Sequence, residues 1–401
     1  MNWRTTSRAA FLVLVASLAA GRASARQGNA APAEQTPASA QFRLGGNAAE
    51  IPARFIDHLV FLPARVNRSQ PSLFELDSTA RSSSIDPDRM KELRIVNLQG
   101  PVLNMSGVDV TLTSLGENAK KDFGAQVGRE YEGTLGNDFL SGAVIEINYA
   151  RQTVRFYDPS YQYSGGGKAI HLSFIGGLPV VRAKVSVQGG KAVEGDFVVN
   201  SALNASLLIS QTFAQSHKLR PHKTAPSAEF PTAYGDSAVL GRVGEFEIGP
   251  FAIAQSIGVF AAPDRLPDRG TRLAGEIGGR MLGRFIVTID YPHQQIILDP
   301  SSNFRSDEFE DMSGLGIVAG GPGLKRFEVI QVWPHTPGAE AKVRKGDIIE
   351  GINDEAAADM SLPEIRALFR QPSAKYKVLL ARGNQTLTVN LQLKRLLEPL
   401  R

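Results

Sequence analysis

Two short segments of this chain carry residues suited to acid–base chemistry at matching places. Asp77 and Ser78 follow one apolar segment, and Asn200 and Ser201 follow a similar segment 123 positions later. Two carboxyl groups held about 3 Å apart share one proton, because they cannot both ionise. The ionised group can then take a proton from an attacking water while the protonated group donates to the scissile carbonyl. Asn200 forms hydrogen bonds but cannot exchange a proton near neutral pH, so half of such a pair is missing.

The two segments belong to a longer internal repeat. Leu-Gly and Ile-Gly pairs, ending at Gly136 and Gly278, follow the two segments and lie 142 positions apart. A repeat of this length predicts two similar lobes rather than a solenoid, whose repeats are several-fold shorter. Asp77 alone would be read as a turn residue, since Asp commonly bonds its own backbone in turns, but the second copy argues for more.

Short alternating or apolar runs predict strands in both halves of the repeat. Examples are residues 59–67, 179–187 and 285–291, and each half closes with a hairpin-like pair of runs. Such runs, bounded by turn residues, are typical of β structure. We therefore expect a mainly β fold, with the glycines of residues 165–167 separating the lobes.

The repeated segments resemble the paired lobes of aspartic proteases of the pepsin and retropepsin type, over residues 50–302. In that family each lobe contributes an Asp-Thr/Ser-Gly turn and a later apolar-apolar-Gly segment that packs beneath it. The resemblance implies a two-lobed acid-protease β-barrel domain, with lobe 1 at residues 50–163 and lobe 2 at residues 168–302. A fused pair of lobes completes its cleft within one chain, so we expect a monomer.

The resemblance also assigns roles to the repeated residues. It places Asp77 at the first catalytic position and Asn200, a degenerate residue, at the second. Ser78 and Ser201 keep the hydroxyls that cross-brace the two turns in the family. The glycine that ends each family turn is absent from both copies, and a Cβ there is expected to crowd the cleft. The resemblance therefore implies a retained scaffold with impaired peptidase activity.

The C-terminal residues 311–396 resemble a PDZ domain of the kind found in bacterial proteases. A Gly-Leu-Gly-Ile loop, a strand and an Arg-Lys-Gly-Asp turn precede a predicted helix, in the order and spacing of that family. In the family, the loop offers backbone N–H groups to a C-terminal carboxylate, and the peptide adds as a strand to a sheet edge. The helix stripe would wall the groove, although such a stripe can equally be ordinary core. The candidate peptide-binding residues are Gly314, Leu315, Gly316, Ile317, Leu362 and Ile365.

The N-terminal residues predict export. Residues 1–25 combine early arginines, a short apolar stretch and an Ala-Ser-Ala end, as in a secretory signal peptide. Residues 26–49 are rich in Ala, Pro, Gln and Gly, which favours a disordered linker. The chain has no cysteine, which excludes disulfides and lipid attachment at a processed Cys. We expect a bacterial protein that is periplasmic or secreted.

Charge and composition bear on the partners. The net charge of +4 falls to +1 once the three arginines of residues 1–25 are removed, since that segment contains no acid. A nearly neutral chain gives no argument for nucleic acid as a partner. No segment after the signal approaches the roughly 20 apolar residues of a membrane span. The scattered histidines lack zinc-site spacing, and no dinucleotide motif is present, so we expect neither a metal nor a cofactor.

The sequence leaves three function classes open, and with them whether the protein is an enzyme. The first is a non-catalytic binder of peptides or protein C-termini. The second is an active aspartic endopeptidase centred on Asp77 that tolerates Asn200. The third is a structural adaptor, which differs from the first only in whether the old cleft still binds anything.

Overall fold

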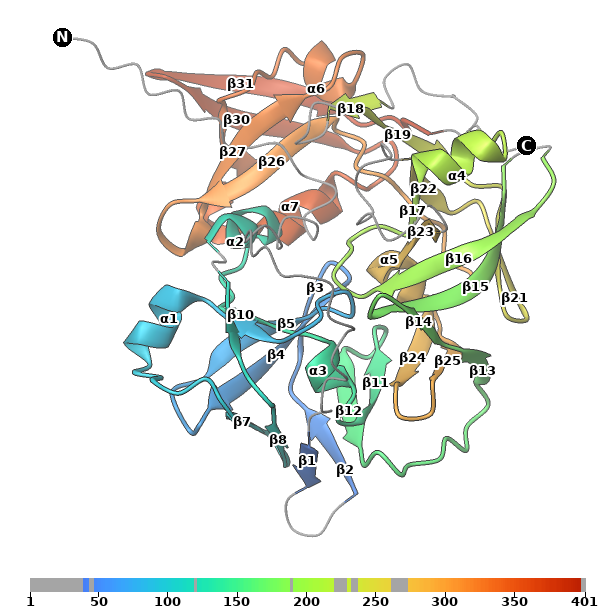
Figure 1. Cartoon of the computed structure of the whole chain (residues 1–401). Helices are drawn as coiled ribbons and strands as arrows, with labels where there is room; N and C mark the ends of the chain where they lie inside the picture. The colour runs from blue at the N-terminus through green and yellow to red at the C-terminus, as the bar shows by residue number, and fades with distance from the viewer. Residues whose placement is uncertain are drawn as a thin grey trace.

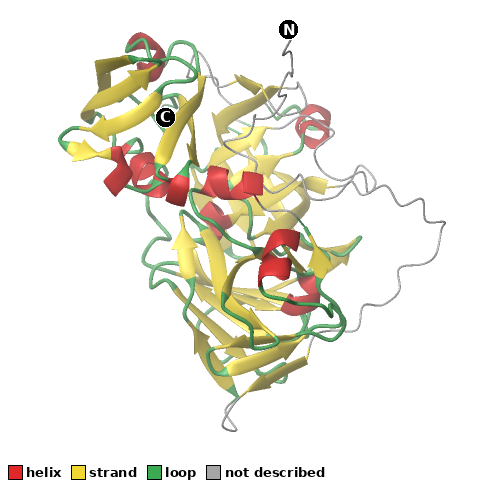
Figure 2. Cartoon of the chain, turned by 90° about the vertical axis from the view of Figure 1, so that its left-hand side faces the viewer, coloured by secondary structure: helices red, strands yellow, loops and turns green. Residues whose placement is uncertain are grey.

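The structure is a computed structural model that describes residues 39–42, 47–118, 121–187, 190–219, 229–231, 237–260 and 273–397. Two β-rich lobes and a C-terminal domain pack together (Figure 1). Strands fill most of the molecule, and several short helices lie between the upper and lower sheets (Figure 2). The signal peptide predicted at residues 1–25 lies outside the described residues.

Lobe 1 is built on a curled sheet whose described strands run in the order β1-β8-β7-β4-β5-β10-β6-β9, with β3 paired to β4. Strand β5 ends immediately before Asp77 and pairs in parallel with β10. The elements are β1 (Ser39–Phe42), β3 (Arg54–Ile56), β4 (Leu59–Val66), β5 (Ser72–Leu76), β6 (Ser84–Ile85), β7 (Val102–Met105), β8 (Val108–Thr111), β9 (Gly116–Glu117), β10 (Gly133–Leu135), α1 (Pro87–Glu92), α2 (Lys121–Val127) and α3 (Asn137–Leu140).

Lobe 2 repeats this plan in a sheet of order β18-β19-β22-β17-β23-β16-β15-β20-β21, with β14 paired to β15. Strand β16 ends at Asn200 and pairs in parallel with β23. The elements are β14 (Ser173–Ile175), β15 (Leu178–Ser186), β16 (Val193–Asn200), β17 (Leu207–Ile209), β18 (Glu229–Pro231), β19 (Ser237–Arg242), β20 (Glu245–Ile248), β21 (Phe251–Ala254), β22 (Ile257–Phe260), β23 (Leu273–Gly278), α4 (Gln211–Ser216) and α5 (Gly279–Leu282).

A third sheet joins the lobes, because strands from both pair within it in the order β13-β25-β24-β11-β12-β2. Strand β11 of lobe 1 pairs with β24 of lobe 2 along five residue pairs. Its strands are β2 (Ala48–Ile51), β11 (Val144–Asn148), β12 (Thr153–Tyr157), β13 (Lys168–His171), β24 (Phe285–Asp290) and β25 (Gln295–Pro300). One apolar core runs through both lobes, and it includes the repeated Phe74 and Phe197.

The C-terminal domain has its own apolar core and a sheet of order β26-β27-β28-β30-β31, in which β26 is an edge strand. Helix α7 begins at a capping box, in which Ser361 and Glu364 satisfy each other's backbone N–H groups. The elements are β26 (Leu315–Gly320), β27 (Arg326–Val332), β28 (Ile348–Ile352), β29 (Glu355–Ala356), β30 (Lys375–Arg382), β31 (Gln385–Gln392), α6 (Pro337–Glu340), α7 (Leu362–Leu368) and the 3-10 helices η3 (Pro322–Leu324) and η4 (Ala357–Asp359).

Part of the predicted linker at residues 26–49 is ordered, which corrects that expectation. Strand β1 pairs with β8, and β2 pairs with β12 at the edge of the joining sheet. Edge pairing satisfies the backbone of a segment whose side chains show no apolar periodicity, so composition alone missed these strands. Residues 26–38 and 43–46 lie outside the described residues.

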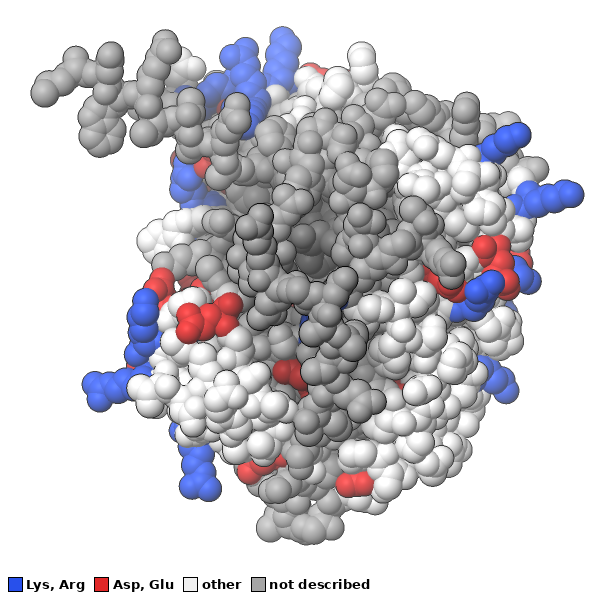
Figure 3. Space-filling model, in the orientation of Figure 1, with Lys and Arg blue, Asp and Glu red and all other residues white. Residues whose placement is uncertain are grey.

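Charged side chains of both signs lie on the described surface (Figure 3). Lys and Arg side chains are spread along the edge of the face shown in Figure 3, with Asp and Glu among them. None of the helices in the described part of the chain is long and apolar enough to cross a membrane.

Candidate functional site

The ends of β5 and β16 meet where the two lobes face each other. The Ser78 hydroxyl donates to the carbonyl of Val199 (2.7 Å), and the Ser201 hydroxyl donates to the carbonyl of Leu76 (2.6 Å). Each hydroxyl also accepts from the other serine's backbone N–H, at 3.0 Å in both directions. Both serines are buried. This four-bond brace holds Asp77 and Asn200 on neighbouring turns.

The two turns are supported from below in the same way. The backbone N–H after Gly136 donates to the carbonyl of Ala80, and the N–H after Gly278 donates to the carbonyl of Leu203, at 2.8 and 2.7 Å. A Cβ on Gly136 would lie 2.7 Å from the carbonyl oxygen of Ala80, and one on Gly278 would lie 2.2 Å from that of Ala205. Glycine is therefore required at both places, which explains why the Leu-Gly and Ile-Gly pairs recur with the turns.

Asp77 is tied into its own turn. Its Oδ1 accepts from the backbone N–H of Thr79 (2.8 Å), the Thr79 hydroxyl (2.7 Å) and the backbone N–H of Ala80 (3.2 Å). The Thr79 side chain supports the carboxyl group of Asp77. These three hydrogen bonds fix the position of the carboxyl group within its turn.

Asn200 has both of its amide atoms engaged. Its Oδ1 accepts from the backbone N–H of Ala202 at 3.0 Å, and its Nδ2 donates to Oε2 of Glu276 at 2.5 Å. Asn200 and Ala202 are buried, whereas Asp77 is half-buried. The second turn thus presents a fixed carboxamide rather than a titrating group.

Glu276 is a site residue that the sequence analysis missed. It lies in β23, two residues before Gly278, with a side chain that is almost fully buried. Burial raises the pKa of Glu276 to about 7, the Asn200 hydrogen bond opposes this rise, and the Asp77 charge adds to it. A charged residue inside the otherwise apolar run of residues 273–278 was the available signal.

Metal ligands are not gathered in this part of the molecule. Among the described residues, no group of three or more His, Asp or Glu side chains could hold a metal ion.

The Gly-Leu-Gly-Ile loop lies at the start of β26. Gly314 has a φ of +68°, and a Cβ there would lie 2.1 Å from the Thr336 hydroxyl, so glycine is required. The backbone N–H of Leu315 donates to the Ser313 hydroxyl at 3.1 Å. Leu315 and Gly316 pair with β27 through Val332 and Gln331. One of the loop N–H groups expected to receive a carboxylate is thus already bonded within the loop.

The groove between β26 and α7 is assembled, but lobe 1 lies against it. Leu362 and Ile365 of α7 are fully buried and belong to the apolar core of the C-terminal domain itself. A Cβ on Gly128, which follows α2, would lie 2.6 Å from the Cβ of Leu362, so lobe 1 packs directly on the start of α7. Figure 1 shows α2 beside α7 and beneath β26. Arg366 donates to the carbonyl of Ile317 at 3.2 Å, which occupies a backbone acceptor of β26.

A buried carboxylate joins all three parts of the chain. Asp57, between β3 and β4, accepts from Arg370 of α7 (2.7 Å) and from Asn204 of lobe 2 (3.0 Å), and lies 3.9 Å from Arg366. Burial disfavours the ionised form, but the charges of Arg370, Arg280 and Arg366 prevail and hold the pKa of Asp57 well below its usual range.

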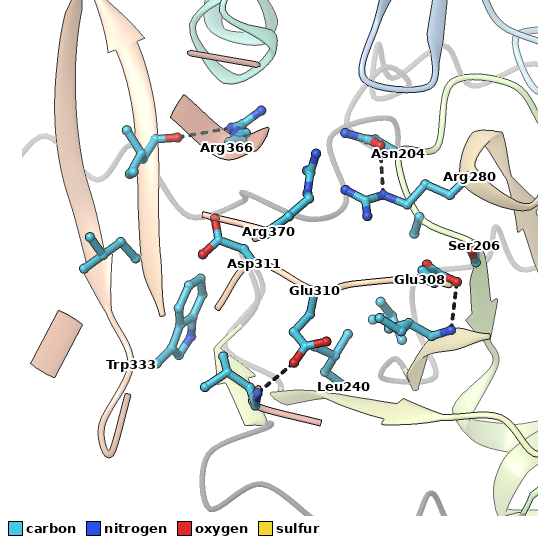
Figure 4. A pocket seen from close by; sticks show the side chains of 16 residues that line it. Asn204, Ser206, Leu240, Arg280, Glu308, Glu310, Asp311, Trp333, Arg366 and Arg370 are labelled. Atoms are coloured by element: carbon cyan, nitrogen blue, oxygen red, sulfur yellow. Dashed lines mark hydrogen bonds between the residues drawn. The ribbon is translucent and has the colours of Figure 1, made fainter. Parts of the chain in front are cut away.

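A cavity of about 100 Å³ lies beside this junction, between lobe 2 and the C-terminal domain. Arg280, Arg366 and Arg370 reach toward it, with Glu310 and Trp333 on the other side (Figure 4). Arg280 already donates to Asn204 and to the carbonyl of Phe309. The arginines that line the cavity are therefore largely engaged by the protein itself.

Comparison with known protein families identifies the C-terminal domain. Residues 328–382 match the family model described as PDZ domain, which confirms that part of the prediction. The chain is thus mainly β, with two curled half-barrel lobes followed by a PDZ domain, as the sequence predicted. A comparison with curated proteins finds no match.

Solved structures give distant likenesses. One is a photosystem II D1 C-terminal processing protease, at 25% identity and a TM-score of 0.18, covering 20% of this chain and 22% of that one. Basic 7S globulin from soybean has 10% identity and a TM-score of 0.38, covering 65% and 97%. The aspartic proteinase from Irpex lacteus has 11% identity and a TM-score of 0.39, covering 65% and 98%. The pepsin or retropepsin type of the lobes remains a prediction.

We predict that the serine brace stabilises the lobe interface. Ser78→Ala would leave the buried Ser201 N–H and Val199 carbonyl without these partners, which should lower the free energy of unfolding by about 1–3 kcal/mol. Urea denaturation of the full chain measures this. Ser78→Thr keeps the hydroxyl and serves as the matched control. A Ser78→Ala protein as stable as the wild type would contradict the role of the brace.

We predict that Glu276 makes the protein less stable as the pH rises from 4.5 to about 7. Its pKa is 4.5 in the unfolded chain and about 7 in the folded one, so over that range only the unfolded state releases the proton. The unfolding free energy should therefore fall by about 3 kcal/mol relative to Glu276→Gln, which has no proton to lose. Denaturation of both proteins across this range checks the sign, and parallel pH profiles would refute it.

Proposed function

We propose that this protein is an exported, protease-like peptide-binding protein, with an impaired catalytic cleft and a PDZ domain that binds peptides or protein C-termini. The observation that supports this proposal most directly is the state of the second turn. Asn200 stands there in place of a carboxyl group, and both its amide nitrogen and its amide oxygen are hydrogen-bonded within lobe 2. A carboxamide cannot exchange protons with water or substrate near neutral pH, so the turn pair lacks one partner for acid–base hydrolysis.

The cleft retains features that suit binding. Asp77 is half-buried and offers a carboxylate acceptor held by its own turn. The brace keeps the two turns in place without help from a ligand, so little ordering cost would accompany binding. An extended peptide whose backbone N–H groups face Asp77 is the ligand class that this arrangement favours.

The PDZ domain offers the second peptide site, through the edge strand β26. PDZ domains take extended peptides by adding a strand to such an edge. Here lobe 1 packs on α7 at Leu362, and Arg366 occupies the Ile317 carbonyl. Leu315 and Ile317 of β26 also face lobe 2 across the cavity. Ligand binding therefore requires the lobes to move away, and the apparent affinity is reduced by the fraction of molecules that are open.

A second candidate function is an active aspartic endopeptidase centred on Asp77. The observation that favours it is Glu276, a titratable carboxyl group hydrogen-bonded to Asn200. Glu276 gives lobe 2 a group that can hold a proton, although this group lies on the neighbouring strand β23 rather than in the turn.

Peptide turnover distinguishes the two functions. We expect the wild type to show little hydrolysis of a mixed peptide library between about pH 3 and pH 7. The double variant Asn200→Asp/Glu276→Gln should raise the rate by about 100-fold or more, because it restores an acid at the second turn. Adding Asp77→Ala to that variant should abolish the gain. Efficient cleavage by the wild type, lost on Asp77→Ala, would instead establish the second function.

Binding of C-terminal peptides tests the PDZ assignment in the full chain. Peptides that end in a free carboxylate should bind more weakly to the wild type than to Asp57→Asn, because that variant weakens the ion pairs that hold lobe 1 against α7. We expect at least a tenfold gain, toward the micromolar range typical of an open module, about 8 kcal/mol.

Two controls accompany the binding measurement. The exposed Asp354→Asn carries the same substitution elsewhere in the PDZ domain and should leave affinity unchanged. The same peptides with an amidated C-terminus test whether binding requires the free carboxylate. Equal binding of free and amidated peptides would rule out carboxylate capture.

A further inference from the structure

The second lobe carries a carboxyl group at a position where the first lobe has none. In β10 the residue two places before Gly136 is Thr134, which pairs with Glu75 of β5. In β23 the residue two places before Gly278 is Glu276, which pairs with Val198 of β16. The two lobes thus differ at equivalent places in both strands.

The surroundings of Glu276 leave it few polar neighbours. Its strand lies between β16 and β17, where the paired residues Val198 and Leu208 are both apolar and buried. The amide of Asn200 donates to its Oε2 at 2.5 Å. Of the described charged groups, Asp77 from lobe 1 is the one that acts on Glu276, and it makes ionisation less favourable.

The serine brace fixes the distance across this group of side chains. Because Ser78 and Ser201 bind each other's strands, Asp77 and Asn200 cannot separate without breaking four hydrogen bonds. Asn200 in turn is held to Glu276. Asp77, Asn200 and Glu276 therefore form one connected set that reaches from the half-buried turn of lobe 1 into the buried sheet of lobe 2.

We propose that Asp77 and Glu276 are an electrostatically coupled carboxyl pair of this cleft, with Asn200 hydrogen-bonded to Glu276 as the fixed amide of the second turn. Glu276 acts through Asn200 and is therefore a positioning residue. In its protonated form it keeps lobe 2 neutral while Asp77 is ionised, so the cleft carries one negative charge. The ligand class is an uncharged stretch of peptide backbone that binds against that single charge.

The inference deepens the proposed function of the cleft and rests on it. A ligand that covers the cleft removes water from both carboxyl groups, which penalises a second negative charge. Peptide binding should therefore be strongest at acid pH, where Glu276 holds its proton, and should weaken as the pH rises through about 7.

The first experiment follows the buried carboxyl group itself, by infrared difference spectroscopy of the full chain during a pH titration. We expect a protonated carboxyl band that disappears near pH 7 in the wild type and is missing in Glu276→Gln. In Asp77→Asn the midpoint of that band should fall by about one pH unit, because a nearby like charge is gone.

Asp138→Asn, at another buried carboxyl group whose pKa burial raises, is the matched control and should leave the midpoint unchanged. A midpoint that does not move in Asp77→Asn would overturn the pairing, as would a band that persists in Glu276→Gln. Circular dichroism of each variant ensures that only folded protein is compared.

The second experiment measures binding of a pepstatin-type peptide to the full chain at about pH 5 and pH 8. The wild type should bind at least tenfold more tightly at the lower pH, and Glu276→Gln should bind equally at both. A pH dependence that Glu276→Gln retains would overturn the inference. Absence of binding at either pH, with the carboxyl coupling intact, would instead refute only the proposed binding function of the cleft.

Discussion

The exchange of hydrogen bonds between Ser78 and Ser201 is the constraint on which the arrangement of the lobes depends. Each hydroxyl satisfies a backbone carbonyl and a backbone N–H of the opposite lobe, and both lie in the interior. Buried backbone groups are costly to leave without partners, so the two strand ends must stay together. The parallel pairs β5–β10 and β16–β23 then carry the same geometry into each lobe.

The PDZ domain is joined to this frame both by apolar contacts, such as Gly128 against Leu362 and Ile257 against Leu397, and by charge. Its apolar cluster is separate from that of the lobes, and the Asp57 carboxylate bridges to Arg370 and Arg366. Removing one partner of a buried ion pair leaves the other charge uncompensated. Loss of either Asp57 or its arginine partners should therefore destabilise the junction. The same contacts hold lobe 1 against α7.

The sequence predicted the features that recur or follow a strict order. Asp77 and Asn200 stand out because two copies repeat with fixed spacing. The PDZ domain was recognisable because its segments follow the family order, and the family match covers residues 328–382. Glu276 escaped notice because its importance depends on the strand register that places it beside Asn200. The contact between Gly128 of lobe 1 and Leu362 depends on packing between domains, for which local patterns contain no signal.

The position of Glu276 explains how lobe 2 can keep a carboxyl group near the paired turns although the second turn itself carries Asn200. At the turn itself, a carboxylate in place of Asn200 would lie across the brace from Asp77, where two carboxyl groups compete for one proton. Glu276 sits within β23, below the turn, with Asn200 engaged between it and the cleft. Lobe 2 can thus hold a proton without presenting an acid to the scissile bond. Such a cleft keeps the charge balance of a carboxyl pair while losing the direct proton donor that rapid hydrolysis requires.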